Sequence, residues 1–404
     1  MSDNKRTPQI RFKGFTDDWE QRKLDKLLEQ YTEVTTINDQ YPALTSSRKG
    51  IFFQTEYFAG NQIASQNNVG YNIVPRNYFT YRHMSDDEIF HFNINNICDF
   101  GIVSTLYPVF TTKKELDSKY LQYQLNYGTE FAKFATLQKQ GGSRTYMYFA
   151  KLKELELTIP KIEEQKKISS ILSNVDKLIT LHQRKCDKLV NMKKSMLEKM
   201  FPKNSEKVPE IRFKGFIDDW EQRKWSDCVD ISNNMVDPRT GKYDKLPHIG
   251  PGNIESFTGQ FYDNIKTVGE ENLISGKFHF FSGDIIYGKI NPQLGKYVLP
   301  LFEGLSSADS YVLNSKNGLA QKYLFTILQT KDFYKYSTSV SMRSGMPKIN
   351  RDELNSYEFN APSFSEQKKI GTLFTNIDNL ITLHQRKLEK LNSLKKSMLE
   401  KMFI

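Results

Sequence analysis

The sequence predicts an α+β protein: two mixed α/β domains joined by two long antiparallel helices that form a coiled coil, with a pseudo-twofold internal repeat. Three observations predict this fold, namely the length, a duplicated frame and a heptad pattern. The 404 residues suffice for two domains, each with its own core. The duplicated frame divides the chain into equivalent halves, and the heptad pattern marks one long helix in each half.

Two kinds of segment occur twice. "PQIRFKGFTDDWEQRKL" at Pro8–Leu24 returns as "PEIRFKGFIDDWEQRKW" at Pro209–Trp225. A helical segment that opens with "EQKKI" at Glu164 and contains "LITLHQRK" recurs from Glu366, where both motifs are unchanged. The inserts between these segments match poorly. One frame is therefore repeated around two inserts, which we expect to share a mixed α/β fold and to differ in the loops that carry recognition.

The repeat also predicts the domain boundaries. They are a first domain at 1–159 that includes the repeated segment 8–24, a helix at 160–201, a linker at 202–208, a second domain at 209–361 that includes the repeated segment 209–225, and a second helix at 362–404.

Apolar residues in both helices alternate at spacings of three and four, which is typical of a coiled coil. The expected seam of the helix pair comprises Ile168, Ile171, Val175, Leu178, His182, Leu189, Met192 and Met196, and in the second helix Ile370, Leu373, Ile377, Leu380, His384, Leu391, Leu394 and Met398. In an antiparallel pair, His182 faces His384 near the crossing point, where a polar residue fixes the register. Exposed or partner-facing histidines are the alternative. A metal site is disfavoured, because two histidines lack the third and fourth ligands.

Charge and cysteine usage narrow the function. The net charge is +10, from 57 basic and 47 acidic residues. Pro160–Phe201 carries a net +5 and Pro362–Ile404 a net +4, so nearly all the excess lies on the helices and says little about the domains. The cysteines at 98, 186 and 228 are too scattered for a disulfide framework or a zinc site.

Motifs for catalysis and for membranes are missing. No Gly-Lys pair is followed by Ser or Thr, which excludes a P-loop. A nuclease that uses Asp18, Glu20 and Arg22 of "DDWEQRK" is an alternative, but such residues beside an aromatic anchor usually form a solvated face. No signal peptide or apolar run of membrane length is evident, so we expect a cytoplasmic protein without catalytic residues, cofactor or metal of its own.

The layout resembles the specificity subunit of type I restriction–modification enzymes over essentially the whole chain. The resemblance rests on "EQKKI" opening each helix, the duplicated "LITLHQRK", the "IRFKGF…DDWEQRK" heads, "LPHIGPGNIE" and "FFSGDIIYGKI" in the second insert, and "GGSRTYMYFAKLKELELTIPKIEEQ" in the first. It implies that each domain is a target recognition domain for one half of an asymmetric bipartite DNA sequence. The helices would set the spacing and bind two methyltransferase subunits. These use S-adenosylmethionine to methylate adenine, and two restriction subunits with ATP and magnesium complete the enzyme. A two-domain coiled-coil scaffold that does not read DNA is the alternative.

Polar and Arg-containing loops are the expected base contacts, since Arg and Asn can pair bidentately with guanine and adenine. In the first domain we expect Ser47, Arg48, Arg82, His83, Ser143, Arg144 and Tyr146, and in the second Lys245, His248, Asn253, Lys289, Asn291, Arg343 and Ser344.

Overall fold

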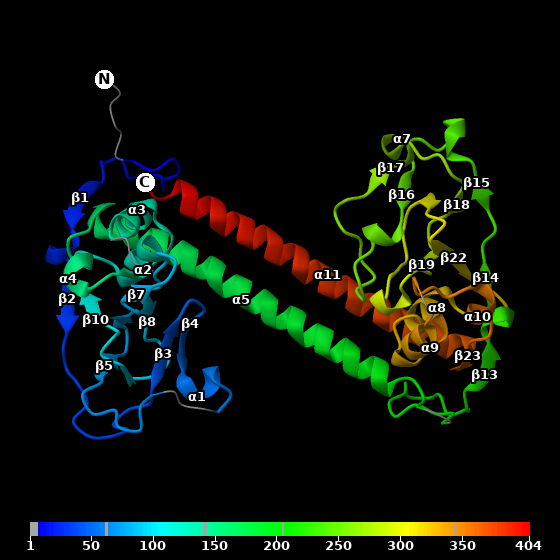
Figure 1. The fold of residues 1–404 in the computed structure, drawn as a ribbon, viewed down its shortest axis with the longest axis horizontal. Helices are drawn as coiled ribbons and strands as arrows, with labels where there is room; N and C mark the ends of the chain where they lie inside the picture. The colour runs from blue at the N-terminus through cyan, green and yellow to red at the C-terminus, as the bar shows by residue number, and fades with distance from the viewer. Residues whose placement is uncertain (1–6, 61–63, 140–143, 204–205, 343–344) are drawn as a thin grey trace. The chain divides into compact units, whose positions relative to one another are not determined.

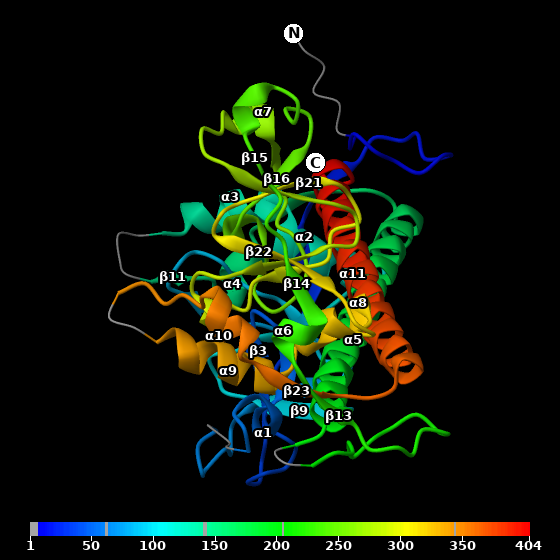
Figure 2. The same ribbon diagram turned by 90° about the vertical axis from the view of Figure 1, so that its right-hand side faces the viewer.

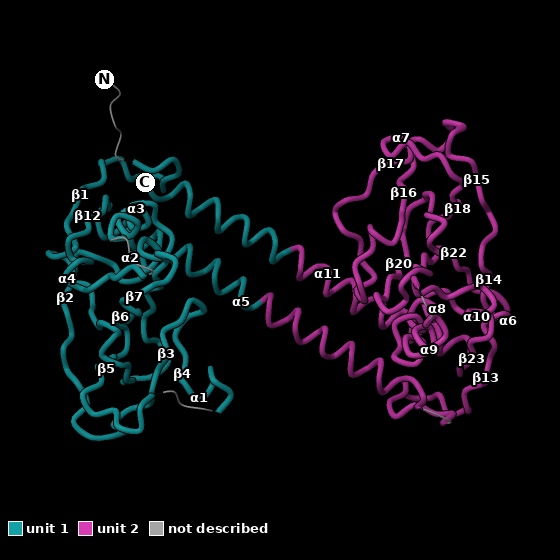
Figure 3. The backbone as a smooth tube through the Cα atoms, viewed as in Figure 1, with its two compact units in different colours: residues 1–181, 387–404 teal, residues 182–386 magenta. Residues whose placement is uncertain are grey.

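The computed structural model describes residues 7–60, 64–139, 144–203, 206–342 and 345–404. Contacts group the chain into two compact units, residues 1–181 with 387–404 and residues 182–386 (Figure 3). The first unit therefore combines the N-terminal half with the last helical turns of the chain. Within the described ranges, no helix is both long and apolar enough to cross a membrane.

The first unit contains many short strands and few helices before its long helix (Figure 1). Its elements are β1 (Glu20–Lys23), β2 (Leu28–Tyr31), β3 (Leu44–Ser47), β4 (Gly50–Phe53), α1 (Gln54–Tyr57), β5 (Asn72–Pro75), β6 (Phe79–Thr80), β7 (Met84–Ser85), β8 (Asn93–Ile94), β9 (Phe100–Val103), β10 (Val109–Thr112), α2 (Ser118–Tyr127), α3 (Thr129–Leu137), β11 (Thr145–Tyr146), α4 (Phe149–Leu152), β12 (Glu156–Ile159) and the beginning of α5 (Ile162–Lys199).

An antiparallel four-stranded sheet with the order β2-β10-β6-β8 is central to the first unit. Phe79 and Phe110 of neighbouring strands stack with their ring centroids 4.7 Å apart, and both are fully buried. The carboxylate of Asp117 caps α2 by accepting the N–H of Tyr120. Side chains of α2 and α3 join the same apolar core as the sheet.

The second unit follows a similar order of elements. Its elements are β13 (Glu221–Lys224), α6 (Trp225–Cys228), β14 (Val229–Ile231), β15 (Met235–Val236), β16 (Pro247–Ile249), β17 (Lys266–Thr267), α7 (Val268–Glu271), β18 (Lys277–Phe280), β19 (Ile285–Gly288), β20 (Tyr297–Val298), β21 (Gly304–Ser306), β22 (Ser310–Ser315), α8 (Gln321–Ile327), α9 (Lys331–Ser341), α10 (Arg351–Asn355), β23 (Glu358–Ala361) and most of α11 (Phe364–Lys401).

The two inserts share their central sheet. In the second unit, β14-β22-β19-β20 form an antiparallel sheet with the same pattern as β2-β10-β6-β8. The inserts differ beyond this sheet. The first carries three two-stranded ladders, β3-β4, β5-β9 and β7-β11, whereas the second carries a five-stranded sheet, β15-β18-β21-β16-β17. The expectation of a common fold with divergent additions is confirmed.

The repeated segments build the same frame in each unit. β1 pairs with β12, and β13 pairs with β23 in the corresponding register. The backbone N–H of Ile10 donates to the carbonyl of Lys401 at 2.9 Å, and that of Ile211 donates to the carbonyl of Lys199 at 2.9 Å. Each "IRFKGF" segment therefore docks beside the end of a long helix.

Two buried ion pairs explain why "EQKKI" opens both helices. Glu164 accepts hydrogen bonds from Nε and Nη2 of Arg11 at 2.7 and 2.8 Å, and Glu366 accepts them from Arg212 at 2.9 and 2.8 Å. The glutamate side chains are 1% exposed. Arginine of one repeated segment thus fastens it to the first turn of the helix of the same unit by a bidentate contact.

The long helices run antiparallel within each unit. In the second unit, Nδ1 of His182 lies 2.8 Å from Nδ1 of His384, and Lys193 pairs with Asp378 at 2.6 Å. A later residue of α5 thus meets an earlier residue of α11, so the two helices are antiparallel. In the first unit, the N-terminal half of α5 shares a core with the last turns of α11, which include Met402. The two histidines face each other, as the antiparallel arrangement predicts.

The buried seam departs from the expected one at one position in each heptad. Val175, Ile377 and the other residues at the shared position, 168, 182, 189, 196, 370, 384, 391 and 398, are buried or half-buried. The second position lies one residue later than expected, at 172, 179, 186 and 193, and at 374, 381, 388 and 395. Leu373 is half-buried, and five expected residues are exposed: Ile171, Leu178, Met192, Leu380 and Leu394. In several turns, both the expected position and the position one residue later hold apolar residues. Packing against the domain cores buries the residue at the later position.

α8 lies beside α11 in the second unit (Figure 2), and Gly371 permits the close approach of the two helices. A Cβ at this position would lie 2.7 Å from the carbonyl carbon of Lys322 and 2.8 Å from the nitrogen of Tyr323, both in the backbone of α8. Gly371→Ala is expected to lower the free energy of unfolding by about 1–3 kcal/mol, because a helix backbone cannot yield as a side chain does.

Urea unfolding measures this difference. Thr372→Ala, at the exposed neighbouring position, is the control and should change stability little. Equal midpoints for Gly371→Ala and the unsubstituted protein would contradict the close approach of α8 to α11.

Candidate nucleic-acid interface

The first unit gathers several expected base-contacting residues around a pocket of about 240 Å³. Ser47, Arg48 and Arg82 line this pocket. The β3-β4 hairpin supplies the first two. The amide of Asn93 holds the hairpin in place by donating to Ser46 Oγ at 2.8 Å and to the Ser47 carbonyl at 2.9 Å.

The β7-β11 ladder brings a distant segment to the same place. Tyr146, two residues after Arg144, pairs with Met84 across this ladder. Both Arg144 and Tyr146 are exposed. Ser143, which was expected beside them, lies outside the described residues. The structure therefore assembles residues from three parts of the sequence into one surface, which is a suitable arrangement for reading a base pair from several directions.

Carboxylates contact two of these arginines. Nε of Arg144 donates to Asp86 at 2.9 Å, and Arg48 pairs with Asp87. Hydrogen bonds from Arg48 and Ser85 lower the pKa of Asp87 to about 2, so this carboxylate is ionised at any physiological pH. The arginines are thus held in defined positions before any ligand binds.

Three rings form a stack beside the arginines. Tyr148 stacks on His83 with centroids 4.9 Å apart and on Tyr146 with centroids 5.8 Å apart. The tyrosines are 54% and 41% exposed, whereas His83 is buried and its Nδ1 faces the carbonyl of Leu106. The expectation that His83 contacts bases is therefore replaced by a supporting role beneath the tyrosines. Exposed aromatic faces suit stacking on nucleotide bases.

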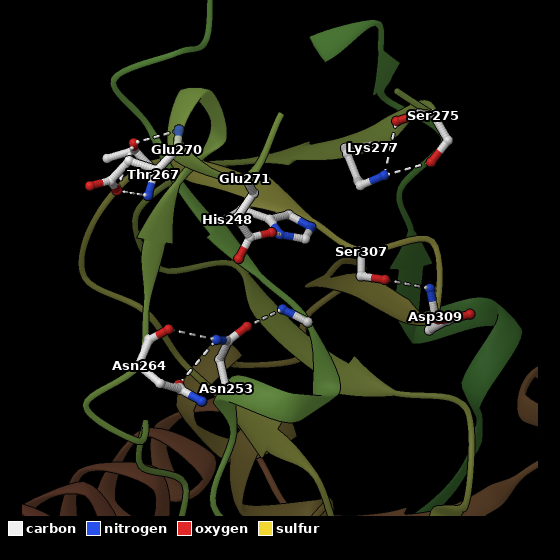
Figure 4. Close-up of polar contacts among 11 residues, drawn as sticks. His248, Asn253, Asn264, Thr267, Glu270, Glu271, Ser275, Lys277, Ser307 and Asp309 are labelled. Carbon is white, nitrogen blue, oxygen red and sulfur yellow. Dashed lines mark hydrogen bonds and ion pairs between the residues drawn. The ribbon is translucent and has the colours of Figure 1, made fainter. Parts of the chain in front are cut away.

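The second unit does not place its expected residues on one surface. His248 is buried, and its Nδ1 lies 2.6 Å from Oε2 of Glu271 (Figure 4). Burial lowers the pKa of His248, although the Glu271 carboxylate opposes this effect. A base cannot reach this imidazole, so the expected contact of His248 is not carried forward. β16 lies between β17 and β21 in the five-stranded sheet, and a motif alone does not reveal this interior position.

Asn253 holds a loop together rather than presenting its amide. Its Oδ1 accepts the N–H of Gly250 at 2.8 Å, and its Nδ2 donates to Asn264 Oδ1 at 3.1 Å (Figure 4). This half-buried side chain is occupied by local contacts, so the expectation that it contacts a base is also withdrawn.

Two expected residues of the second unit lie together at the end of β19. Lys289 places its ammonium 5.3 Å from the ring centre of Tyr311, and Asn291 adopts a left-handed conformation with φ of 50°. Burial lowers the pKa of Lys289. Lys245 is exposed elsewhere, in the loop before β16. Arg343 and Ser344 lie outside the described residues.

Sequence reasoning missed the carboxylates and Tyr148. Asp86, Asp87 and Glu88 form the run "DDE" between predicted base contacts. The signal was available, because an acidic run among arginines predicts ion pairs. Which arginine meets which carboxylate depends on the β7-β11 ladder, whose two-residue strands leave little sequence signature.

The "DDWEQRK" segments have a structural explanation. "EQRK" forms β1 and β13, the frame strands. Asp17 pairs with Lys161 at 2.6 Å, and Gln21 donates to Glu156 at 2.8 Å. No group of three or more His, Cys, Asp or Glu side chains within the described residues could hold a metal ion. Of the residues that suggested a nuclease, Arg22 pairs with Glu20 at 3.5 Å on the exposed side of β1.

Each unit also carries a groove beside the C-terminal turns of one long helix. In the second unit, a groove of about 550 Å³ is lined by helix residues 190, 193, 194, 197 and 198 together with the α9 region. In the first unit, a groove of about 380 Å³ is lined by helix residues 392, 395, 396, 399 and 400 together with Tyr127 and Thr129. The helix positions correspond one by one through the repeat, so the chain presents the same helical surface twice.

Comparison with known proteins relates both halves to one family. Residues 16–191 and 217–393 match the family model described as "Type I restriction modification DNA specificity domain". The specificity subunit of the type I restriction enzyme EcoDI from Escherichia coli is 30% identical over 210 residues, which are 50% of this chain and 46% of the relative. The chain thus spans about half the length of that relative.

Two further proteins are similar over more of the chain. The MjaVIII specificity subunit of Methanocaldococcus jannaschii is 26% identical over 322 residues, 74% of this chain and 72% of the relative. The crystal structure of the type I restriction–modification S subunit from M. genitalium superposes with a TM-score of 0.59 and 14% identity, and covers 98% of this chain and 99% of that one. At this identity, the superposition shows a shared fold.

Proposed function

The chain belongs to the family of type I restriction–modification specificity subunits, and on this premise we propose that each unit reads one half of a bipartite DNA target. One observation carries the proposal: an identical frame, fastened by Arg11–Glu164 in one unit and Arg212–Glu366 in the other, holds two inserts whose exposed additions differ. A repeated frame with unlike loops suits a target whose two halves differ in sequence.

In the first unit, Arg48, Arg82, Arg144 and Tyr146 are proposed to contact the DNA, with Tyr148 beside them. Arginine can donate two parallel hydrogen bonds to guanine in the major groove, and the tyrosines offer apolar faces to thymine methyl groups or to unstacked bases. In the second unit, Lys289 and Asn291 are proposed to serve in the same way, and Lys245 is proposed as a separate contact in the loop before β16.

Two copies of a methyltransferase subunit are the proposed occupants of the grooves. The helix residues at 190–198 and 392–400 are equivalent through the repeat, so one kind of partner surface fits both. The leucines at 178, 181, 380 and 383 are also exposed in equivalent pairs, which suits helix-on-helix packing by a partner. In this proposal S-adenosylmethionine belongs to the methyltransferase subunits, and ATP and magnesium belong to two restriction subunits. This chain supplies recognition.

Charge reversal in the grooves tests the stoichiometry. Lys194 and Lys396 are exposed at equivalent positions. Lys194→Glu or Lys396→Glu alone is expected to leave a complex with one tightly bound methyltransferase subunit. The double variant is expected to leave a complex with none, because the reversed charge is unfavourable when the partner covers the groove. Native mass spectrometry measures the masses. Lys185→Glu, exposed outside both grooves, is the control, and a loss of both subunits in a single variant would contradict two independent grooves.

Mapping methylated adenines in DNA from cells that express this chain with its methyltransferase tests DNA reading. A single split sequence with unlike halves is the expected result. Methylation that does not change when this chain is omitted would instead favour the scaffold without DNA reading.

A further inference from the structure

Three consecutive carboxylates in the first unit each hold a basic side chain from a different segment. Asp86 pairs with Arg144, Asp87 with Arg48, and Glu88 with Lys139. We call residues 86–88 the acidic loop. Its basic partners come from the start of the β11 region, the β3-β4 hairpin and the segment after α3, so the loop is the point where these three segments meet.

The acidic loop is built rigidly. Ser85 Oγ donates at 2.8 Å to Asp87 and also lies 2.8 Å from the carbonyl of Ile89, which closes the loop on itself. Glu88 has a φ of 66°, a left-handed conformation that a residue with a Cβ adopts at some energetic cost. Such strain is retained where the surrounding contacts fix it.

Stability does not account for these pairs. The side chains of Arg48 and Asp87 are 57% and 44% exposed, and those of Arg144 and Asp86 are 50% and 66% exposed. Ion pairs exposed to this extent contribute little to folding. Their placement at the surface proposed to meet DNA therefore calls for a role in binding.

Phosphate and base contacts depend differently on a nearby carboxylate. Attraction to phosphates depends on net positive charge and is the same for every sequence. Base reading depends on donors held in a fixed direction. Arg48 uses Nη2 and Arg144 uses Nε for the loop, and a guanidinium has five N–H donors, so pairing leaves further donors on each. The loop therefore offsets charge while fixing direction.

We propose that the acidic loop is an electrostatic selectivity device, which weakens binding to DNA of arbitrary sequence while it holds Arg48 and Arg144 for base contacts. The inference rests on the proposed reading of DNA by the first unit. At the matching place in the second unit, after β19, the chain carries "KINPQ" at Lys289–Gln293, which has no acidic residue. The device belongs to the first unit, and its effect is expected on one half-site.

The experiment uses the full chain assembled with its methyltransferase subunits. Binding to a duplex that carries the mapped target and to a shuffled duplex is measured by fluorescence anisotropy over a range of salt concentrations. The variant is Asp86→Asn with Asp87→Asn, which removes charge and retains shape. Asp99→Asn, which removes a surface carboxylate paired with Arg76 at 2.8 Å, is the matched control.

The shuffled duplex is expected to bind the double variant about tenfold more tightly and with a steeper dependence on salt, by roughly one unit of slope for each additional phosphate contact. The target duplex should change less, so the ratio of the two affinities falls about tenfold. The control should leave the ratio unchanged.

Three results would overturn the proposal: an unchanged affinity for shuffled DNA, an equal gain on both duplexes, or a loss on the target alone, which would leave the loop a positioning role only. A failure of the proposed function is distinguishable, because the unsubstituted complex would then show no preference for the target duplex.

Discussion

Replacing Arg212 with methionine is expected to lower the free energy of unfolding of the second unit by about 3 kcal/mol, the lower end of the range for a broken buried ion pair. The Glu366 carboxylate is buried and receives both of its hydrogen bonds from Arg212. Without the guanidinium it must stay charged without a partner or become protonated. The lower end applies because 11% of the Arg212 side chain is exposed.

A double variant separates the pair from its parts. Arg212→Met with Glu366→Leu should recover most of the loss, because an apolar pair of similar volume avoids the cost of desolvating both charges. Nη1 of Arg212 is buried without an acceptor among the described residues. This cost reduces the net contribution of the charged pair to the free energy of unfolding. Full loss in both variants would contradict this account.

Tryptophan fluorescence during urea unfolding provides the measurement. The chain has three tryptophans, of which Trp220 and Trp225 are buried in the second unit. A Trp19→Phe background reports that unit alone. Arg11→Met is the matched variant of the first unit and should leave the fluorescence midpoint of the second unit unchanged.

The frame could be predicted from the sequence because its segments occur twice in the chain. Repetition identified the segments, and their order required α11 to return toward the first "IRFKGF" segment. The Ile10–Lys401 hydrogen bond and the facing pair of His182 and His384 agree with that reasoning. The bidentate partners of Glu164 and Glu366 were not predicted, because nothing local distinguishes a buried carboxylate from an exposed one at a helix start.

The seam was predicted in one of its two positions for a physical reason. Ile171 and Leu172 are both apolar, as are Leu178 and Ile179, so a spacing of three or of four fits the heptad equally well. The choice depends on which face also meets the domain core. Leu172 is fully buried there, while Ile171 is exposed. Tertiary packing decided what the pattern left open.

The structure brings together more of the expected site residues in the first unit than in the second. Arg48, Arg82 and Arg144 were named because they belong to polar loops and arginine can pair bidentately with guanine. His248 was named as a polar loop residue and Asn253 because asparagine can pair with adenine. In the structure, His248 lies beside Glu271, and Asn253 holds its own loop together. Histidine and asparagine serve structure as readily as recognition, so their identity is a weaker signal than that of arginine.

Arg144→Ala is expected to weaken binding of the assembled methyltransferase complex to its target by about 1–3 kcal/mol, the range for one bidentate base contact. Asp86 holds this guanidinium through Nε, and the guanidinium has further N–H donors for a base. Binding to shuffled DNA should change little, because Asp86 already offsets much of the charge that a phosphate would meet. Anisotropy titrations on both duplexes measure the two losses.

Arg144→Lys distinguishes direction from charge. Lysine keeps the charge but lacks the planar fork, so a base contact predicts a loss close to that of alanine, whereas a phosphate contact predicts near-complete recovery. Base substitutions in the target then locate the contact. If Arg144 reads one base pair, the unsubstituted and Arg144→Ala complexes should bind equally to a target duplex altered at that pair. They should still differ in affinity for target duplexes altered at any other single pair. Equal losses on target and shuffled DNA would assign Arg144 to the phosphate backbone instead.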